Sequence, residues 1–205
     1  MKVTDFDALR RLMPPPDDPG LSVDWDRMTK SWGTPFPADY RAFIDLYGTG
    51  TIENHLVVVR PEPKDAPSDS GMVNETATAH LNWPRGSKAP ELAGAEPALI
   101  TWGVNESPDL LCWDASGSDP DSWPVVVFAA DDVQWRRYDC GMVGFLRRVF
   151  DAEFDESPLS ATTLWGLGSA KFLTVAEQMR LLRAGLDPWT GKPDEFAGMY
   201  TYPEP

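Results

Sequence analysis

The sequence predicts an α+β protein in which helices pack on an antiparallel β-sheet, followed by a helical C-terminal extension. Amphipathic segments with recognisable starts and stops lie near the N-terminus. Four short apolar runs with brief polar connections follow between residues 98 and 139. This spacing indicates an antiparallel meander, because parallel strands need long crossover connections. Another amphipathic segment ends this unit near residue 151.

The length and composition are those of one globular domain with an extension. The 205 residues are 42% hydrophobic and 24% charged. A chain of this size buries about 70% of the surface that its unfolded form exposes, so it needs no disulfide or metal for stability. We expect an N-terminal helix and proline-rich linker over 1–20, an α+β domain over 21–151 with a loop-rich insertion at 61–97, and an extension over 152–205 with one helix.

The first two predicted helices have local start and stop signals. Thr4 can cap the first one, which ends at a proline-rich run. In the second, Trp25, Met28 and Trp32 recur at helical spacing and form one apolar stripe. Gly33 follows this stripe and is expected to end the helix.

A third helix is expected after Pro37. Its buried stripe consists of Tyr40, Phe43, Ile44 and Tyr47, and Asp39 is expected to face solvent. The following Gly48-Thr49-Gly50 could in principle cradle a phosphate. It lacks the full GxGxxG spacing and follows a helix C-terminus, the negative end of the helix dipole, so a phosphate site is disfavoured. Gly48 is predicted to be a left-handed helix cap.

The remaining segments are less regular. The run "TIENHLVVVRP" is predicted to be one strand that contains His55. The insertion contains one short helix, "MVNETATAHLNW". In the extension, Thr174 and Glu177 form a capping box for a helix that Gly185 ends. The last twenty residues are expected to be a polar tail, draped over the surface or mobile.

The formal charge is −14, and the excess of acidic residues extends over both 1–150 and 151–205. Direct binding of nucleic acid is disfavoured, since phosphate contacts need clustered Lys and Arg. A basic protein partner fits this charge, and plain solubility is the alternative explanation. The sequence shows no apolar run typical of a signal peptide or a membrane span, and only two cysteines, so we expect a cytoplasmic protein. Export without a cleaved signal stays open.

No motif nominates an active site, and we predict no catalytic, cofactor-binding or metal-binding residues. His55 and His80 lack a set of companion ligands for a metal. There is no GxSxG motif to mark a nucleophile. A hydrolase that uses a pair of aspartates remains as an alternative.

The turn "WDASGSDPDSW" is the densest acidic cluster. Its aspartates could form turn hydrogen bonds, contact a partner or bind calcium, although the spacing is not that of an EF-hand. Trp113 and Trp123 bracket the turn, and we expect at least one of them to be exposed as an aromatic anchor for a basic partner. The predicted partner-binding residues are Asp114, Asp119, Asp121, Trp123, Asp131 and Asp132.

The stretch "WGTPFPADYRAFIDLYGTGTI" resembles the opening signature of the SUKH superfamily. The signature residues are Trp32, Gly33, Pro37, Tyr40, Tyr47, Gly48 and Gly50. The later "LITWGVNESPDLLCWDASGSDPDSWPVVVF" is similar to the second block of the family, and the helix with Phe145 and Leu146 is similar to its ending. The resemblance covers about 21–151 and leaves the insertion and the extension unmatched.

The resemblance implies an α+β fold and a binding function. Many bacterial members resemble immunity proteins that bind and neutralise a cognate toxin, often a nuclease. Fungal members are similar to intracellular interaction hubs in cell-wall synthesis and signalling. No catalytic set is associated with the fold. We therefore expect a non-catalytic bacterial immunity protein for a basic toxin domain. The alternative is an intracellular regulatory or scaffold protein of the same fold without a toxin partner.

Overall fold

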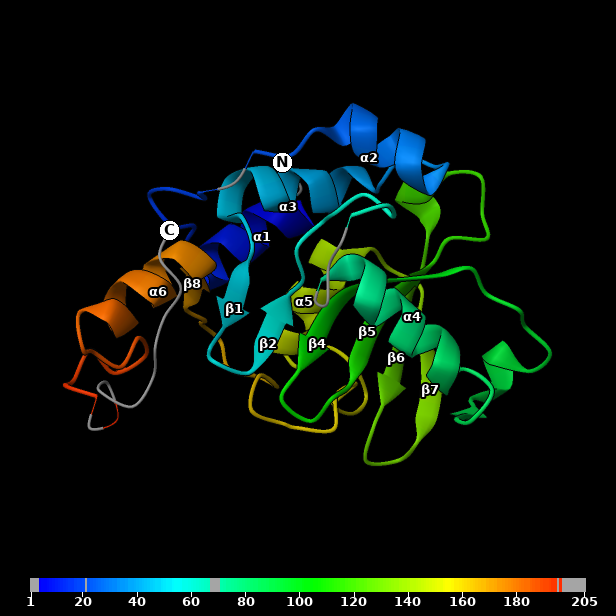
Figure 1. Cartoon of the computed structure of the whole chain (residues 1–205). Coiled ribbons are helices and arrows are strands. Elements are labelled where there is room, and N and C mark those ends of the chain that lie inside the picture. Colours follow the sequence, from blue (N-terminus) through cyan, green and yellow to red (C-terminus); the bar gives the residue numbers. More distant parts are fainter. Residues whose placement is uncertain (1–3, 21, 67–70, 195, 197–205) are drawn as a thin grey trace.

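The computed structural model describes residues 4–20, 22–66, 71–194 and 196, which form one eight-stranded sheet with helices packed on both faces (Figure 1). The α-helices are α1 (Asp5–Leu12), α2 (Trp25–Trp32), α3 (Ala38–Tyr47), α4 (Met72–Asn82), α5 (Met142–Phe150) and α6 (Val175–Arg183), with 3₁₀ turns η1 (Pro90–Leu92) and η2 (Pro120–Ser122). The strands are β1 (Gly50–Ile52), β2 (Leu56–Val58), β3 (Ser87–Lys88), β4 (Leu99–Asn105), β5 (Leu110–Asp114), β6 (Val125–Ala129), β7 (Gln134–Tyr138) and β8 (Phe172–Thr174).

The strand order is β3-β7-β6-β5-β4-β2-β1-β8. Strands β4 to β7 form the predicted antiparallel meander, so the α+β class is confirmed. The expectation of a purely antiparallel sheet is wrong, because β3 pairs with β7 in parallel. The sheet is therefore mixed and mostly antiparallel.

The prediction of a single strand over "TIENHLVVVRP" is also wrong, because β1 and β2 form a hairpin there. Glu53 and Asn54 have φ angles of 51° and 61°, and His55 N donates to Ile52 O at 2.9 Å, which closes the turn. Turns of this hand match the twist of the flanking strands, and asparagine tolerates positive φ. His55 therefore lies in a turn, and its Nδ1 is 2.6 Å from Glu106 Oε1.

The insertion and the extension supply the two edges of the sheet. Strand β3 comes from 61–97, and β8 comes from 152–205 and pairs antiparallel with β1. Gly50 permits the second pairing, since a Cβ at this position would lie 2.1 Å from Leu173 O. The proposed domain boundaries stay a prediction, but both unmatched segments take part in the sheet.

The sheet has a buried layer on each face. Along β6, Val125 and Val127 belong to the larger core cluster, whereas Val126 and Phe128 belong to the smaller one. This alternation follows from the period of two in a strand. Helices α1, α2, α3 and α5 contribute to the larger cluster, and α4, from the insertion, covers the smaller one (Figure 1).

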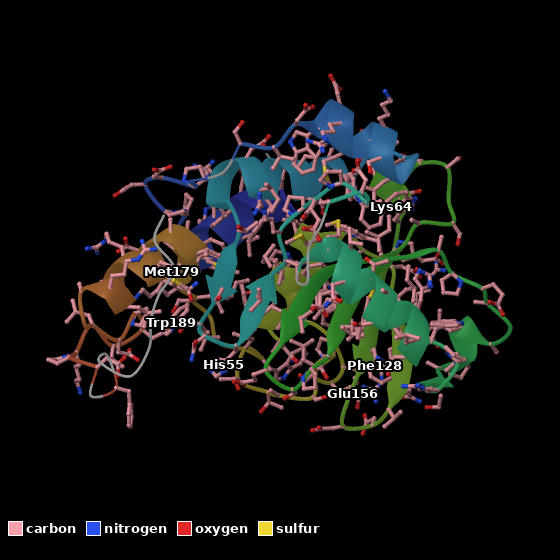
Figure 2. All side chains as sticks on the ribbon, in the orientation of Figure 1. His55, Lys64, Phe128, Glu156, Met179 and Trp189 are labelled. Carbon is pink, nitrogen blue, oxygen red and sulfur yellow. The ribbon has the colours of Figure 1, made fainter. Side chains whose placement is uncertain are left out.

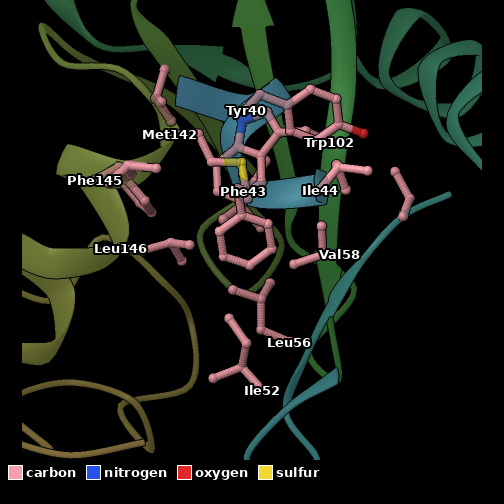
Figure 3. Close-up of a cluster of buried hydrophobic side chains, with 14 of the residues drawn as sticks. Tyr40, Phe43, Ile44, Ile52, Leu56, Val58, Trp102, Met142, Phe145 and Leu146 are labelled. Atoms are coloured by element: carbon pink, nitrogen blue, oxygen red, sulfur yellow. The ribbon is translucent and has the colours of Figure 1, made fainter. Parts of the chain in front are cut away.

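Aromatic rings pack together with aliphatic side chains in the larger core (Figure 3). The stripe of α3 is completely buried, as predicted. Tyr40 contacts Trp113 of β5 edge to face, with ring centroids 4.8 Å apart. The ring centroids of Trp102 in β4 and Phe145 in α5 are 6.1 Å apart. Rings of this size supply much of the apolar area that the fold removes from water.

Several helix ends are as the sequence predicts. The Thr4 and Thr174 side chains accept from Asp7 N and Glu177 N at 3.1 Å. Gly33 adopts the left-handed conformation after α2.

The backbone conformation of Gly48 differs from the left-handed helix cap that the sequence predicts. Its φ is 72° but its ψ is −154°, which lies outside the left-handed helical region. A Cβ on Gly48 would lie 2.0 Å from Pro19 O. Close approach of the linker therefore requires glycine here, in addition to the positive φ angle.

A buried carboxylate ties the extension to the meander. Asp109 is completely buried between β4 and β5. Its oxygens accept from Asn105 Nδ2 at 2.6 Å, from Ala130 N at 2.8 Å, and from Ser160 N at 2.8 Å and Ser160 Oγ at 2.5 Å. Because every donor is supplied by the protein, this burial is compatible with a stable fold.

The predicted tail is only partly described. Residues 195 and 197–205 lie outside the described residues. Before them, Leu186 pairs with Pro193 in an isolated bridge. Lys171 Nζ lies 5.6 Å from the ring centroid of Trp189 and donates to Pro188 O at 3.1 Å. This part of the tail therefore packs against the protein.

Two tyrosines of the α3 stripe give a matched test of the core. The Tyr40 hydroxyl is buried without a hydrogen-bond partner in the described part of the chain, whereas the Tyr47 hydroxyl donates to Met13 O at 2.5 Å. We expect Tyr40→Phe to leave the free energy of unfolding unchanged or raise it, and Tyr47→Phe to lower it by about 1 kcal/mol. Urea unfolding measures both. Equal losses in the two variants would contradict this assignment of the hydroxyl groups.

Candidate functional site: an acidic cleft at helix N-termini

The structure separates the predicted partner-binding residues into two groups. Asp114, Asp119, Asp121 and Trp123 precede β6, and Asp131 and Asp132 follow it. The two groups therefore lie at opposite ends of this strand and do not form one surface.

Within the acidic turn, two aspartates form local hydrogen bonds. Asp114 Oδ1 accepts from Ser116 N at 3.1 Å and from Ser116 Oγ at 2.6 Å. Asp119 Oδ1 accepts from Asp121 N at 3.2 Å and caps η2. Of the three roles that the sequence leaves open for these residues, these bonds support turn formation.

The expectation that Trp113 or Trp123 is exposed is wrong. Trp113 is 0% and Trp123 is 2% exposed. Trp123 Nε1 donates to Gly117 O at 2.7 Å, so the acidic turn folds over the ring. Trp113 lies between α3 and the sheet in the larger core. Both rings contribute to the fold and are not available as exposed anchors.

At the other end of β6, the aspartates are exposed. Asp132 Oδ2 lies 2.7 Å from Arg136 Nη2. The backbone N of Asp131 donates to Ser160 Oγ at 3.2 Å. Exposed pairs such as Asp132 with Arg136 contribute little to stability, about 0–1 kcal/mol.

Helices α3 and α5 begin without a local capping side chain, and distant aspartates replace it. Helix α3 begins after Pro37 and helix α5 after Gly141. Asp121 Oδ1 accepts from Ala38 N at 2.6 Å, at the start of α3. In the same way, Asp39 Oδ2 accepts from Val143 N at 3.1 Å in the first turn of α5. Carboxylates are favourable here because they satisfy free N–H groups and face the positive end of the helix dipole.

These two carboxylates line a cleft of about 500 Å³ with two others, Asp5 at the start of α1 and Asp139 after β7. We call the four residues Asp5, Asp39, Asp121 and Asp139 the acidic cleft. The wall between them includes Phe6, Ala38, Cys140, Gly141, Val143 and Gly144.

Gly141, the N-cap of α5, and Gly144 within this helix leave space for two of the carboxylates. A Cβ on Gly141 would lie 2.6 Å from Asp39 Oδ2, which is closer than real Cβ contacts allow. A Cβ on Gly144 would lie 3.1 Å from Asp5 Oδ2. The observed position of Asp39 therefore needs glycine at 141, and Gly144 leaves room for the close approach of Asp5.

The cleft keeps a negative charge. Arg147 Nε lies 2.7 Å from Asp5 Oδ1, and Arg137 Nε lies 2.8 Å from Asp139 Oδ1. Asp39 and Asp121 have backbone N–H groups as their partners instead. Burial raises the pKa of the Asp39 carboxyl group, and the neighbouring Asp121 charge raises this pKa further.

This arrangement suits a cationic side chain from another molecule. A carboxylate can accept about four hydrogen bonds, so each aspartate keeps capacity after its bond within the chain. Lysine and arginine donors form strong charge-assisted bonds with such groups. Burial raises the pKa of the Cys140 thiol, so this group is protonated at neutral pH and is a poor nucleophile. Among the described residues, no group of three or more His, Cys, Asp or Glu could hold a metal ion.

Sequence analysis identified Asp121 but missed Asp5, Asp39 and Asp139. Asp39 was expected to face solvent, and the structure corrects this, since its side chain caps α5. The signal that could have revealed it is the absence of a local cap at Pro37 and Gly141. A helix that begins without Ser, Thr, Asp or Asn at its N-cap needs another acceptor.

The residues of the SUKH-like signature have structural positions. Tyr40 and Tyr47 are buried, and Trp32 is 8% exposed. Gly33 ends α2, Pro37 precedes α3, and Gly48 and Gly50 permit close backbone contacts.

The raised pKa of Asp39 predicts a pH dependence. The folded state binds this proton more tightly than the unfolded state, so wild-type stability relative to Asp39→Asn should fall as the pH rises through the Asp39 pKa. Below the ordinary aspartate pKa of about 3.9, the two proteins should be nearly equal, because Asn also accepts from Val143 N. At neutral pH, Asp39→Asn should be relatively more stable. Urea unfolding below about pH 3.9 and at neutral pH measures the difference in free energy of unfolding between the two proteins, with the exposed Asp26→Asn as control. A wild-type stability that rises relative to Asp39→Asn with increasing pH would contradict this prediction.

Comparison with protein-family models, curated protein sequences and solved structures finds no match to this chain. None of the described helices has the length and apolar character needed to cross a bilayer. The acidic cleft is therefore the feature on which a functional proposal can be based.

Proposed function

We propose that this chain is a non-catalytic protein-binding module, an immunity protein that binds and neutralises a basic bacterial toxin domain through the acidic cleft. One observation carries this proposal. Four carboxylates from four separate segments converge on one cleft, in a chain whose formal charge is −14. The resemblance of residues 32–52 to the SUKH signature supports a binding role.

The electrostatics of the cleft suit this role. The overall negative charge speeds the encounter with a basic partner, because complementary fields can raise association rates from about 10⁵–10⁶ towards 10⁸–10⁹ M⁻¹s⁻¹ at low salt. The cleft then provides the specific contact, in which a lysine or arginine of the toxin enters between Asp121 and Asp139. Since the helix bonds already fix Asp39 and Asp121, little side-chain ordering remains to oppose binding.

The proposal predicts that a neighbouring gene encodes a secreted protein with a basic toxin domain, and the test uses that domain. We expect stoichiometric binding in calorimetry and rescue of cells that express the toxin. The double variant Asp121→Asn with Asp139→Asn should weaken binding by about tenfold or more, mainly through faster dissociation. Asn at 121 can still accept from Ala38 N, and the Asp139 side chain is 82% exposed, so the fold should be retained.

The matched control is Asp26→Asn with Asp65→Asn, which removes the same charge from exposed positions outside the cleft. It should lower the association rate slightly and leave dissociation unchanged. Equal effects of the two double variants would contradict the cleft as the binding site. Absence of rescue together with co-purification of several host proteins would favour a regulatory or scaffold protein instead.

A further inference from the structure

A second hollow lies between α4, β4 and the end of α2, and the ionisable residues among its described lining are basic. We call it the α4 pocket. Its volume is about 600 Å³, within the range of about 300–1,000 Å³ that is typical of small-molecule sites. Its lining residues are Trp32, Thr34, Lys64, Val73, Thr76, Ala77, His80, Ala98, Leu99, Ile100 and Ala115.

Most of this lining is apolar and held in place by the fold. Leu99 and Ile100 belong to β4, and Val73 belongs to α4. Trp32 forms one wall, and its Nε1 donates to Glu62 O at 2.8 Å, which fixes the orientation of the ring. The Thr76 hydroxyl accepts from Thr101 N at 3.0 Å and holds α4 on the sheet. A pocket of this kind is formed before any ligand arrives.

The charges of the pocket are opposite to the charge of the whole chain. Among the residues that the structure describes, its ionisable lining residues are Lys64 and His80, and no described carboxylate lines it. Lys64 Nζ lies 4.8 Å from the ring centroid of Trp32, beside the end of α2 (Figure 2). The backbone N of Lys64 donates to Ser31 Oγ at 2.8 Å, which anchors this residue to α2. Among the described residues, no carboxylate lies within ion-pair distance of Lys64 Nζ.

We propose that the α4 pocket binds a small organic anion with a planar apolar body. The body packs against Val73, Ala77 and Leu99, and the anionic group pairs with the Lys64 ammonium at the mouth. His80 provides a ring nitrogen for a further hydrogen bond. An apolar surface with one or two convergent polar groups is the usual composition of a site that binds such a ligand. The inference is independent of the toxin partner, since it concerns other residues and needs no second protein.

The experiment uses indole-3-acetate and 1-naphthoate as probes, each compared with its neutral amide. Calorimetry gives the affinities, and the indole N–H resonance of Trp32 in ¹⁵N-labelled protein gives the location. We expect saturable binding of the anions and binding at least about tenfold weaker for the amides, because a hydrogen bond to a charged group exceeds a neutral one. The Trp32 resonance should shift on titration with the anions.

Three variants localise the site. Lys64→Met should weaken binding of the anions about tenfold or more and leave the binding of the amides nearly unchanged. Ala77→Trp should abolish binding of both, because it places a large ring in the pocket from an exposed helix position. Lys192→Met removes an exposed lysine outside the pocket and should bind like wild type. Thermal unfolding confirms that each variant is folded.

Equal affinities for acids and amides, or wild-type affinity in Lys64→Met, would overturn the proposal. Failure of both anions to bind saturably would also overturn it. None of these outcomes affects the toxin proposal, which concerns the acidic cleft.

Discussion

The packing of Tyr40 against Trp113 is the contact on which the acidic cleft depends. This edge-to-face pair, with centroids 4.8 Å apart, holds α3 on the face of β5. With α3 in this position, its first N–H group meets Asp121 of the β5–β6 connection, and its Asp39 reaches the first turn of α5. An apolar contact in the core thus sets the geometry of a charged surface feature, since the carboxylates are fixed only if both helices are fixed.

The carboxylates of the cleft have a structural role as well as the proposed binding role. Asp121 and Asp39 replace the missing local caps of α3 and α5, which stabilises the helices by about 0.5–2 kcal/mol for each cap. The cost is the partial desolvation of like charges, which is visible in the raised pKa of Asp39. A cationic side chain from a partner would relieve this cost, because it would place an opposite charge beside Asp39 and Asp121, which have backbone N–H groups as their partners. Stability of the free protein and affinity for a basic partner are therefore linked through the same groups.

The sequence predicts those parts of the fold that depend on local patterns. The stripe of α3, the Thr4 and Thr174 caps and the β4–β7 meander follow from periodicity and turn residues. The β1–β2 turn was missed because Glu53-Asn54 contains no glycine. Edge strands β3 and β8 are too short to have a pattern of their own and are defined by their partners. The cleft was largely missed for a similar reason. Its aspartates are as far apart as residues 5 and 139, and each looks like an ordinary surface charge in its own segment.

The central claim is that a basic toxin domain binds at the N-termini of α3 and α5. Hydrogen–deuterium exchange of the free protein and of the complex tests it most directly, because these amides lie directly at the proposed contact. The account predicts that binding slows exchange in the segments 38–41 and 139–144, with little change at the β6–β7 turn around Asp131. Protection confined to the 61–97 insertion or to the 152–205 extension, with unchanged exchange at the acidic cleft, would contradict it.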